Sequence, residues 1–301
     1  MKIFSLFKLN TPRQQLALLL FLWLLGVVTS GLFSNLLHIF NGELSANSTI
    51  AALSTNQQRL SQVVFQVFAF FLPSLFLHLL IEDDWQTRIH TARYKWIYAY
   101  YAIAVTVFMA PIIDIVSDWN MAIHVGGEVE TWLRSIEDRA TQLSEAMLTE
   151  GNNFGWVAVQ AIFIMAVLPA FCEEFFFRGT LQPLLIRWFK SPLWGIVASA
   201  FIFSLVHFQF YGFIPRLLLG MAFGYIAYQC GHWLFSALMH FLNNGFIVVI
   251  ALVCKANSYP FSLQDVHFQY TTLMLVFCLL ALPLVVYRLR VLRKYERHIQ
   301  K

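Results

Sequence analysis

The chain contains few charged residues. Charged side chains make up 12% of its 301 residues and hydrophobic side chains 59%, whereas soluble domains carry about 25% charged residues. Apolar runs of about 18 or more residues recur along nearly the whole length, and a run of that length crosses a hydrocarbon core of about 30 Å as a helix. The composition therefore excludes a separate soluble domain and predicts an all-α integral membrane protein.

Paired cysteines are also missing. The thiols are scattered along the chain in apolar surroundings, and none forms a CxxC pair: Cys172, Cys230, Cys254 and Cys278. Because free cysteine packs as a small hydrophobe, we interpret them as buried structural thiols.

Three catalytic motifs known from membrane-embedded enzymes are absent. The sequence has no HExxH, which excludes a zinc protease of the site-2 type, and no GxGD, which excludes the aspartyl type. It also lacks the glycine-flanked serine of the rhomboid type, because Ser204 does not have that context.

The first apolar run has no small-residue cleavage site after it, so we interpret it as a retained span rather than a secretory signal. No internal repeat of the transporter kind is evident. The apolar runs predict about eight spans, and Gly179 and Pro183 predict a bent or interfacial continuation of the fourth over 175–189. The spans are expected at about 16–37, 63–81, 96–116, 154–174, 193–210, 213–229, 233–253 and 271–287.

These spans divide the chain into three regions. Residues 1–153 form an N-terminal three-span region with a polar loop at 41–62, residues 154–253 a core, and residues 254–301 the last span and a basic tail. The long polar segment 117–153 predicts an acidic amphipathic helix over about 127–150. That helix is either a lid or partner surface, or it lies on the outer membrane face or on the loops. Its apolar residues recur at spacings of three and four: Val129, Trp132, Leu133, Ile136, Ala140, Leu143 and Met147.

Lysine and arginine collect at one set of span ends. The opposite set of loops has the acidic helix and a weak, mixed group with Glu43, Arg59, Lys255 and Asp265. Since cytoplasmic loops carry an excess of Lys and Arg, both termini are expected to be cytoplasmic. The absence of a long soluble domain and the compact length favour a bacterial plasma membrane. The basic set comprises Lys2, Lys8, Arg13, Arg88, Arg93, Lys95, Arg178, Arg187, Lys190, Arg288, Arg290, Arg293, Lys294 and Arg297.

Glu173, Glu174 and Arg178 interrupt the fourth apolar span. A charged side chain deep in hydrocarbon costs roughly 2.5–3.5 kcal/mol on insertion scales, so these groups must face partners, water or substrate. Glu174 and Arg178 are four residues apart and able to pair on one helix face. An ion pair does not explain Glu173, which lies about 100° round the helix and is free to face a cavity.

Polar groups also occur in two other spans. His207 is expected deep in the fifth span, and His240 and Asn244 share one face of the seventh, whereas Asn243 is expected to point elsewhere and pack. A lone buried histidine is usually a packing residue, but here neighbouring spans also carry polar groups. A carboxylate and an imidazole can deprotonate a water, and two donors can stabilise an oxyanion. We therefore predict a polar catalytic cavity between spans 4, 5 and 7, with both histidines serving Glu173.

These motifs resemble a known family. Three motifs occur in order, each in its own apolar span: Glu173-Glu174-x-x-x-Arg178, Phe203-x-x-x-His207 and His240-x-x-x-Asn244. Gly220 and Gly224, spaced by four, lie between the second and third motifs. This pattern is similar to the CAAX-processing and bacteriocin-processing (Abi) intramembrane proteases, which include the type II CAAX prenyl endopeptidases.

The resemblance implies a membrane endopeptidase whose cavity is reached from the cytosolic side. It implies that Glu173 with His207 activates water, that His240 with Asn244 forms the oxyanion site, and that Glu174 and Arg178 support them. The expected partners are the lipid bilayer and a membrane-associated protein or peptide substrate, CAAX-like or a peptide precursor, and not nucleic acid.

Two alternatives stay open. Glu173, His207 and His240 could instead supply a three-ligand zinc site, although no cofactor is expected in the first hypothesis. The polar core could also belong to a non-enzymatic membrane scaffold or transporter.

Overall fold

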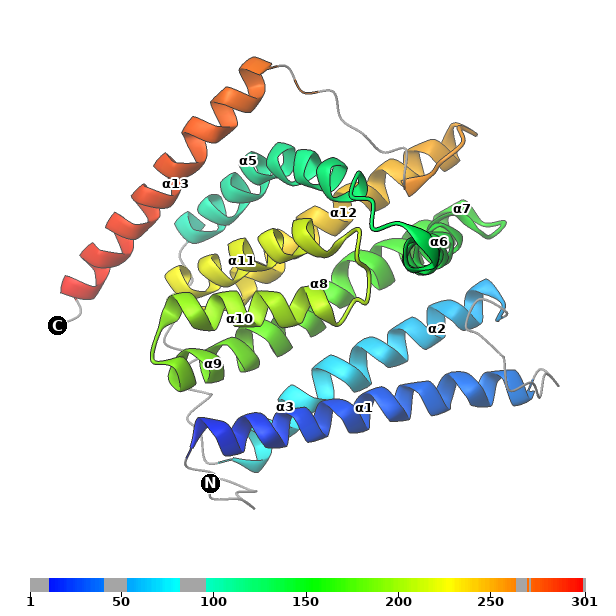
Figure 1. The fold of residues 1–301 in the computed structure, drawn as a ribbon, viewed down its shortest axis with the longest axis horizontal. Helices are drawn as coiled ribbons and strands as arrows, with labels where there is room; N and C mark the ends of the chain where they lie inside the picture. Colours follow the sequence, from blue (N-terminus) through cyan, green and yellow to red (C-terminus); the bar gives the residue numbers. More distant parts are fainter. Residues whose placement is uncertain (1–10, 41–52, 82–95, 264–269, 271, 300–301) are drawn as a thin grey trace.

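The computed structural model describes residues 11–40, 53–81, 96–263, 270 and 272–299. Over these residues the chain is a bundle of helices with no β-strand, which confirms the all-α prediction (Figure 1). Several residues of the charge prediction lie outside the described part: Lys2, Lys8, Glu43, Arg88, Arg93, Lys95, Asp265 and the side chain of Arg297. So does most of the predicted 41–62 loop.

The helices follow the predicted apolar runs. Their bounds are α1 (Pro12–Phe40), α2 (Thr55–Phe65), α3 (Leu72–Leu80), α5 (Trp96–Met121), α6 (Gly127–Thr149), α7 (Phe154–Ala161), α8 (Leu168–Glu174), α9 (Gln182–Phe189), α10 (Pro192–Leu205), α11 (Phe213–Cys230), α12 (Leu234–Ala256) and α13 (Thr272–Ile299). Among the described residues, 6 helical runs are long and apolar enough to cross a membrane: Pro12–Phe40, Thr55–Leu80, Trp96–Met121, Phe154–Phe189, Leu234–Ala256 and Thr272–Tyr295. The chain is thus an integral, multi-pass membrane protein.

Two of the eight predicted spans, 193–210 and 213–229, are not among these runs. Helix α10 has 14 residues, about 21 Å at 1.5 Å per residue, which is shorter than a hydrocarbon core. It ends at Leu205, so His207 lies in the connection to α11 and not deep in a span. The helix cannot continue because Phe208 takes a left-handed backbone conformation with φ of 52°.

The polar stretch 41–62 is not a loop throughout. Helix α2 begins at Thr55, and Ser54 caps it through a capping box with Gln57. Such a reciprocal cap satisfies the first free N–H groups of a helix. The second membrane crossing therefore starts before the predicted Val63.

Three π-helical segments carry the chain past prolines without breaking its helices. They cover Gln66–Phe71, Ile162–Val167 and Phe175–Leu181. Each ends two residues before a proline, namely Pro73, Pro169 and Pro183. Proline lacks an N–H and its ring clashes with the carbonyl four residues earlier, and a wider turn relieves both problems. The predicted bent continuation over 175–189 is therefore part of one helical run, Phe154–Phe189.

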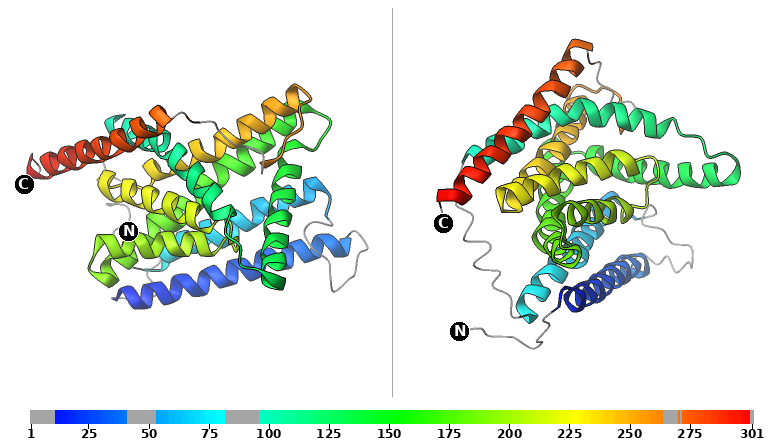
Figure 2. Two further views of the ribbon diagram at one scale, coloured as in Figure 1. Left: turned by 45° about the horizontal axis from the view of Figure 1, so that its top comes forward. Right: turned by 60° about the vertical axis from the view of Figure 1, so that its left-hand side comes forward.

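The run from α7 to α9 lies in the middle of the bundle. Helices α1, α2 and α3 lie on one side of it, and α5, α12 and α13 lie on the other (Figures 1 and 2). The largest buried cluster joins the first side to this run through Leu19, Phe70, Phe176, Phe177 and Leu181. A second buried cluster joins α5, α11, α12 and α13.

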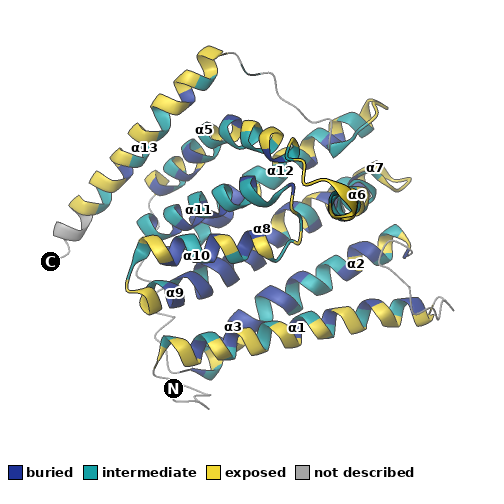
Figure 3. Cartoon of the chain, in the orientation of Figure 1, coloured by how far each residue is buried: buried dark blue, intermediate teal, exposed yellow. Residues whose placement is uncertain are grey.

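Exposed apolar side chains cover the outer helices α1 and α13 (Figure 3). They include Leu20, Phe21, Leu24, Leu32, Leu273, Phe277, Leu280 and Leu284. In water such a surface would be a large apolar patch, but in a bilayer it faces hydrocarbon.

Helix α6 confirms the predicted amphipathic helix to within a residue or two. It runs across the ends of the spans rather than alongside them (Figures 1 and 2), and it contacts α2, α7 and α12. Its start is held by Glu130, which accepts hydrogen bonds from the Gly126 N–H and the Arg134 guanidinium. The Gly126 bond, with help from His124 and Arg134, lowers the pKa of Glu130 to about 2.

We expect Gly26 to be essential for packing α1 against the Gln66–Phe71 segment. A Cβ at Gly26 would lie 1.8 Å from the Phe68 carbonyl oxygen, whereas nothing lies within 4 Å of a Cβ at Gly31 in the same helix. Gly26→Ala should destabilise the fold by about 1–3 kcal/mol, as overpacking does. Gly31→Ala should be neutral or stabilising by up to about 1 kcal/mol through helix propensity. Thermal unfolding in detergent measures both, and equal effects would contradict this packing.

Candidate active site

A cavity of about 650 Å³ lies between the central run, α5, α6, α11 and α12. Glu173, His207, His240 and Asn244 all line it, although they come from α8, the α10–α11 connection and α12. The structure thus brings the predicted catalytic residues to one space. Glu174 and Arg178 lie outside the lining.

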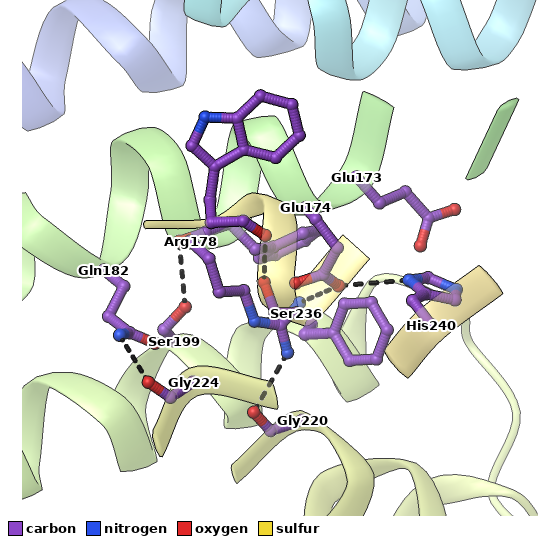
Figure 4. Close-up of polar contacts among 12 residues, drawn as sticks. Glu173, Glu174, Arg178, Gln182, Ser199, Gly220, Gly224, Ser236 and His240 are labelled. Atoms are coloured by element: carbon purple, nitrogen blue, oxygen red, sulfur yellow. Dashed lines mark hydrogen bonds and ion pairs between the residues drawn. The ribbon is translucent and has the colours of Figure 1, made fainter. Parts of the chain in front are cut away.

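Glu174 and Arg178 form the predicted ion pair. Arg178 Nη1 donates to Glu174 Oε1 at 2.7 Å, and both side chains are 0% exposed. Arg178 Nη2 donates to the Gly220 carbonyl at 3.0 Å (Figure 4). The guanidinium also lies over the Phe203 ring, 4.5 Å from its centroid, where the negative face of the ring attracts a cation.

His240 forms its hydrogen bond with Glu174 and not with Glu173. Its Nδ1 lies 3.0 Å from Glu174 Oε1, the oxygen that Arg178 also contacts (Figure 4). The expectation that both histidines serve Glu173 is therefore wrong for the hydrogen bond of His240, although His240 still interacts electrostatically with Glu173. Helical phase assigned one partner to each carboxylate, but a carboxylate oxygen has lone pairs for two donors.

Glu173 has a different partner. Gln66 Nε2 donates to its Oε1 at 2.8 Å, and Glu173 is 5% exposed. Its other oxygen, Oε2, has no hydrogen-bond partner among the described residues. Sequence reasoning missed Gln66, although a lone amide in the apolar run 63–81 was a signal of a buried polar contact.

The tautomer of His207 follows from its contact. His207 Nδ1 lies 2.7 Å from the Phe203 carbonyl oxygen. A carbonyl oxygen only accepts hydrogen bonds, so Nδ1 carries the proton, and Nε2 of the neutral ring has a free lone pair. His207 therefore brings a basic nitrogen to the same cavity as Glu173.

Two asparagine amides lie beside His240. Asn244 Nδ2 donates to the Met165 carbonyl at 3.2 Å, and Asn243 Nδ2 donates to Asn244 Oδ1 at 3.2 Å. The expectation that Asn243 points elsewhere is wrong, because it also lines the cavity. Its bond orients the Asn244 amide so that the nitrogen is the donor.

A chain of polar contacts crosses the cavity near α6. Gln209 Nε2 donates to Glu137 Oε1 at 3.0 Å, and Arg216 Nη2 donates to Gln209 Oε1 at 2.7 Å. Burial raises the pKa of Glu137, and Arg216 partly offsets that effect. Sequence reasoning missed Arg216 and Gln209, although a charge four residues into the span 213–229 was visible.

No group of three or more His, Cys, Asp or Glu side chains is close enough to hold a metal ion in the part of the chain that the structure describes. The zinc alternative stays a prediction that a chelator tests.

Fold and site together define a multi-pass helical membrane protein with a cavity between its helices that carboxylate and imidazole side chains line. Residues 155–246 match the family described as Type II CAAX prenyl endopeptidase Rce1-like. This match confirms the resemblance to that family, and the matched segment holds every predicted site residue. Comparisons with curated proteins and with solved structures gave no match.

We expect Glu174→Leu to destabilise the protein more than Arg178→Leu. The first change strips both Arg178 and His240 of their carboxylate, whereas the second leaves Glu174 bonded to His240. Removing one partner of a buried ion pair costs roughly 3–5 kcal/mol, and replacing both is far less harmful. The double variant should therefore unfold at a higher temperature than Glu174→Leu alone.

The control is Arg139→Leu, which removes an exposed arginine of α6 and should change stability by no more than about 0.5 kcal/mol. If the losses of stability from Glu174→Leu and Arg178→Leu simply add in the double variant, the two residues do not form a coupled network.

Proposed function

We propose that the chain is an intramembrane endopeptidase that hydrolyses a peptide bond of a membrane-associated protein or peptide with water activated by Glu173 and His207. The observation that carries this proposal is the cavity. Residues far apart in the sequence supply it with a carboxylate, two imidazoles and an amide, and all of them lie within the matched segment 155–246.

Glu173 and His207 fit the role of base. Glu173 Oε2 has no hydrogen-bond partner among the described residues, and His207 Nε2 is free of the contact that holds Nδ1. In the proposed step one of these groups takes a proton from water, and the water oxygen forms a bond to the substrate carbonyl carbon. The proton then passes to the leaving amide nitrogen as the carbon–nitrogen bond breaks.

His240 and Asn244 fit the role of oxyanion donors. Glu174 holds the His240 ring by Nδ1, which carries a proton because a carboxylate only accepts. Nε2 is the ring atom available to the cavity, and it donates when the ring is in its doubly protonated, imidazolium form. Asn244 Nδ2 uses one of its two hydrogens on the Met165 carbonyl. Donors fixed in this way stabilise the negative oxygen of a tetrahedral intermediate without rearranging.

Substitution of the proposed base gives the test. In cells with equal amounts of each variant, Glu173→Gln and His207→Gln should lower the yield of specific membrane-protein fragments by at least about 100-fold, because general bases contribute about that much or more. Quantitative proteomics of membrane-protein termini measures this yield.

Cys172→Ala is the matched control, because Cys172 is the buried neighbour of Glu173 and does not line the cavity. It should leave the fragments unchanged. Full activity of Glu173→Gln would exclude the proposed mechanism and favour a scaffold or transporter.

The zinc alternative makes a separate prediction. A water-activating pair of Glu173 and His207 needs no metal, so the purified protein should keep its activity in a strong chelator. Loss of activity that zinc restores, together with stoichiometric metal in the protein, would favour Glu173, His207 and His240 as zinc ligands.

A further inference from the structure

The described charges divide between the two ends of the bundle. One end, here called the basic end, comprises the start of α1, the α9–α10 turn and the end of α13 (Figure 1). It carries Arg13, Arg187, Lys190, Arg288, Arg290, Arg293 and Lys294.

The opposite end, here called the α6 end, comprises the end of α5, α6, and the start of α7 (Figure 1). Acidic residues dominate it: Asp114, Asp118, Glu128, Glu130, Glu137, Asp138, Glu145 and Glu150. Its cations are fewer, and Arg59 is buried against the Met147 and Glu150 carbonyls. Because Lys and Arg mark the cytoplasmic ends of spans, the basic end is the cytoplasmic one.

The cavity lies toward the α6 end. Its lining takes residues from the α6 face and the end of α5, and from the α10–α11 connection, including Ala140, Thr141, Ser144, Ser117 and Gln209. None of the cationic residues of the basic end belongs to the lining.

Toward the basic end the central run closes against α11. Arg178 donates to the Gly220 carbonyl, and one helical turn further on Gln182 Nε2 donates to the Gly224 carbonyl at 2.9 Å (Figure 4). A Cβ at Gly224 would lie 2.4 Å from Gln182 Oε1. Side chains of the central run therefore contact the backbone of α11 directly. This contact leaves no path for a polypeptide between these two helices.

We propose that the cavity opens to the non-cytoplasmic face of the membrane. This inference contradicts the cytosolic access that the family resemblance implies, because cytosolic access and cytoplasmic termini would require the cytosol at opposite ends of this bundle. Its consequence for the substrate rests on the proposed function: the scissile bond belongs to a non-cytoplasmic segment next to the membrane. A cytosolic protein with a prenylated C-terminus is not a substrate in this arrangement.

Cysteine labelling in intact cells tests the orientation without any need for activity. The background is the full chain with Cys254→Ser, since the other native thiols are buried. Reporters are Glu128→Cys on the exposed face of α6, Ser144→Cys in the cavity lining, and Lys294→Cys at the basic end. The probe is a membrane-impermeant maleimide, applied before and after permeabilisation.

We expect Glu128→Cys and Ser144→Cys to be labelled in intact cells and Lys294→Cys only after permeabilisation. Labelling of Lys294→Cys in intact cells with α6 protected would overturn the inference. So would a Ser144→Cys that stays unlabelled beside a labelled Glu128→Cys, because the cavity would then not open to that face.

The outcomes for orientation and for chemistry are separable. If labelling places the cavity on the cytoplasmic face while Glu173→Gln abolishes cleavage, the inference fails and the proposed function stands. If labelling places the cavity on the non-cytoplasmic face but Glu173→Gln leaves cleavage unchanged, the inference stands and the proposed function fails.

Discussion

The structure depends on how one buried carboxylate is neutralised. Glu174 accepts from both Arg178 and His240 on a single oxygen, with no exposure of either charged partner of the ion pair. Unpaired charges at this depth would cost several kcal/mol each, so the surrounding helices must hold all three groups together. The same network fixes the His240 ring beside the cavity, and it ties the central run to α11 through the Gly220 carbonyl.

The position of the carboxylates follows from two prolines. Pro169 and Pro183 are each preceded by a π-helical segment, and the short helix Leu168–Glu174 lies between those segments. Wider turns at both ends let the helical run pass the prolines without a break. On the facing helix a third such segment begins with Gln66, the partner of Glu173. π-helical turns of this kind often occur at functional sites.

Much of this architecture could be predicted from local patterns. Apolar runs predicted most of the spans, and the spacing of apolar residues from Val129 to Met147 predicted α6. The separation of four residues between Glu174 and Arg178 predicted their ion pair. Partners across helices could not be predicted, because Gln66, Gln209 and Arg216 are brought to the cavity by tertiary packing. His207 was placed in a span because its neighbours are apolar, and only the left-handed Phe208 reveals that the helix has already ended.

In the proposed reaction, water activated at Glu173 supplies one oxygen atom of the new C-terminal carboxylate of a cleaved substrate. The direct measurement is incubation of membranes with the protein in ¹⁸O-labelled water, followed by mass spectrometry of new C-termini. We predict fragments whose terminal carboxylate carries ¹⁸O with the unsubstituted chain, and none above background with Glu173→Gln. Equal yields of labelled fragments from both proteins, or fragments without ¹⁸O, would contradict the account.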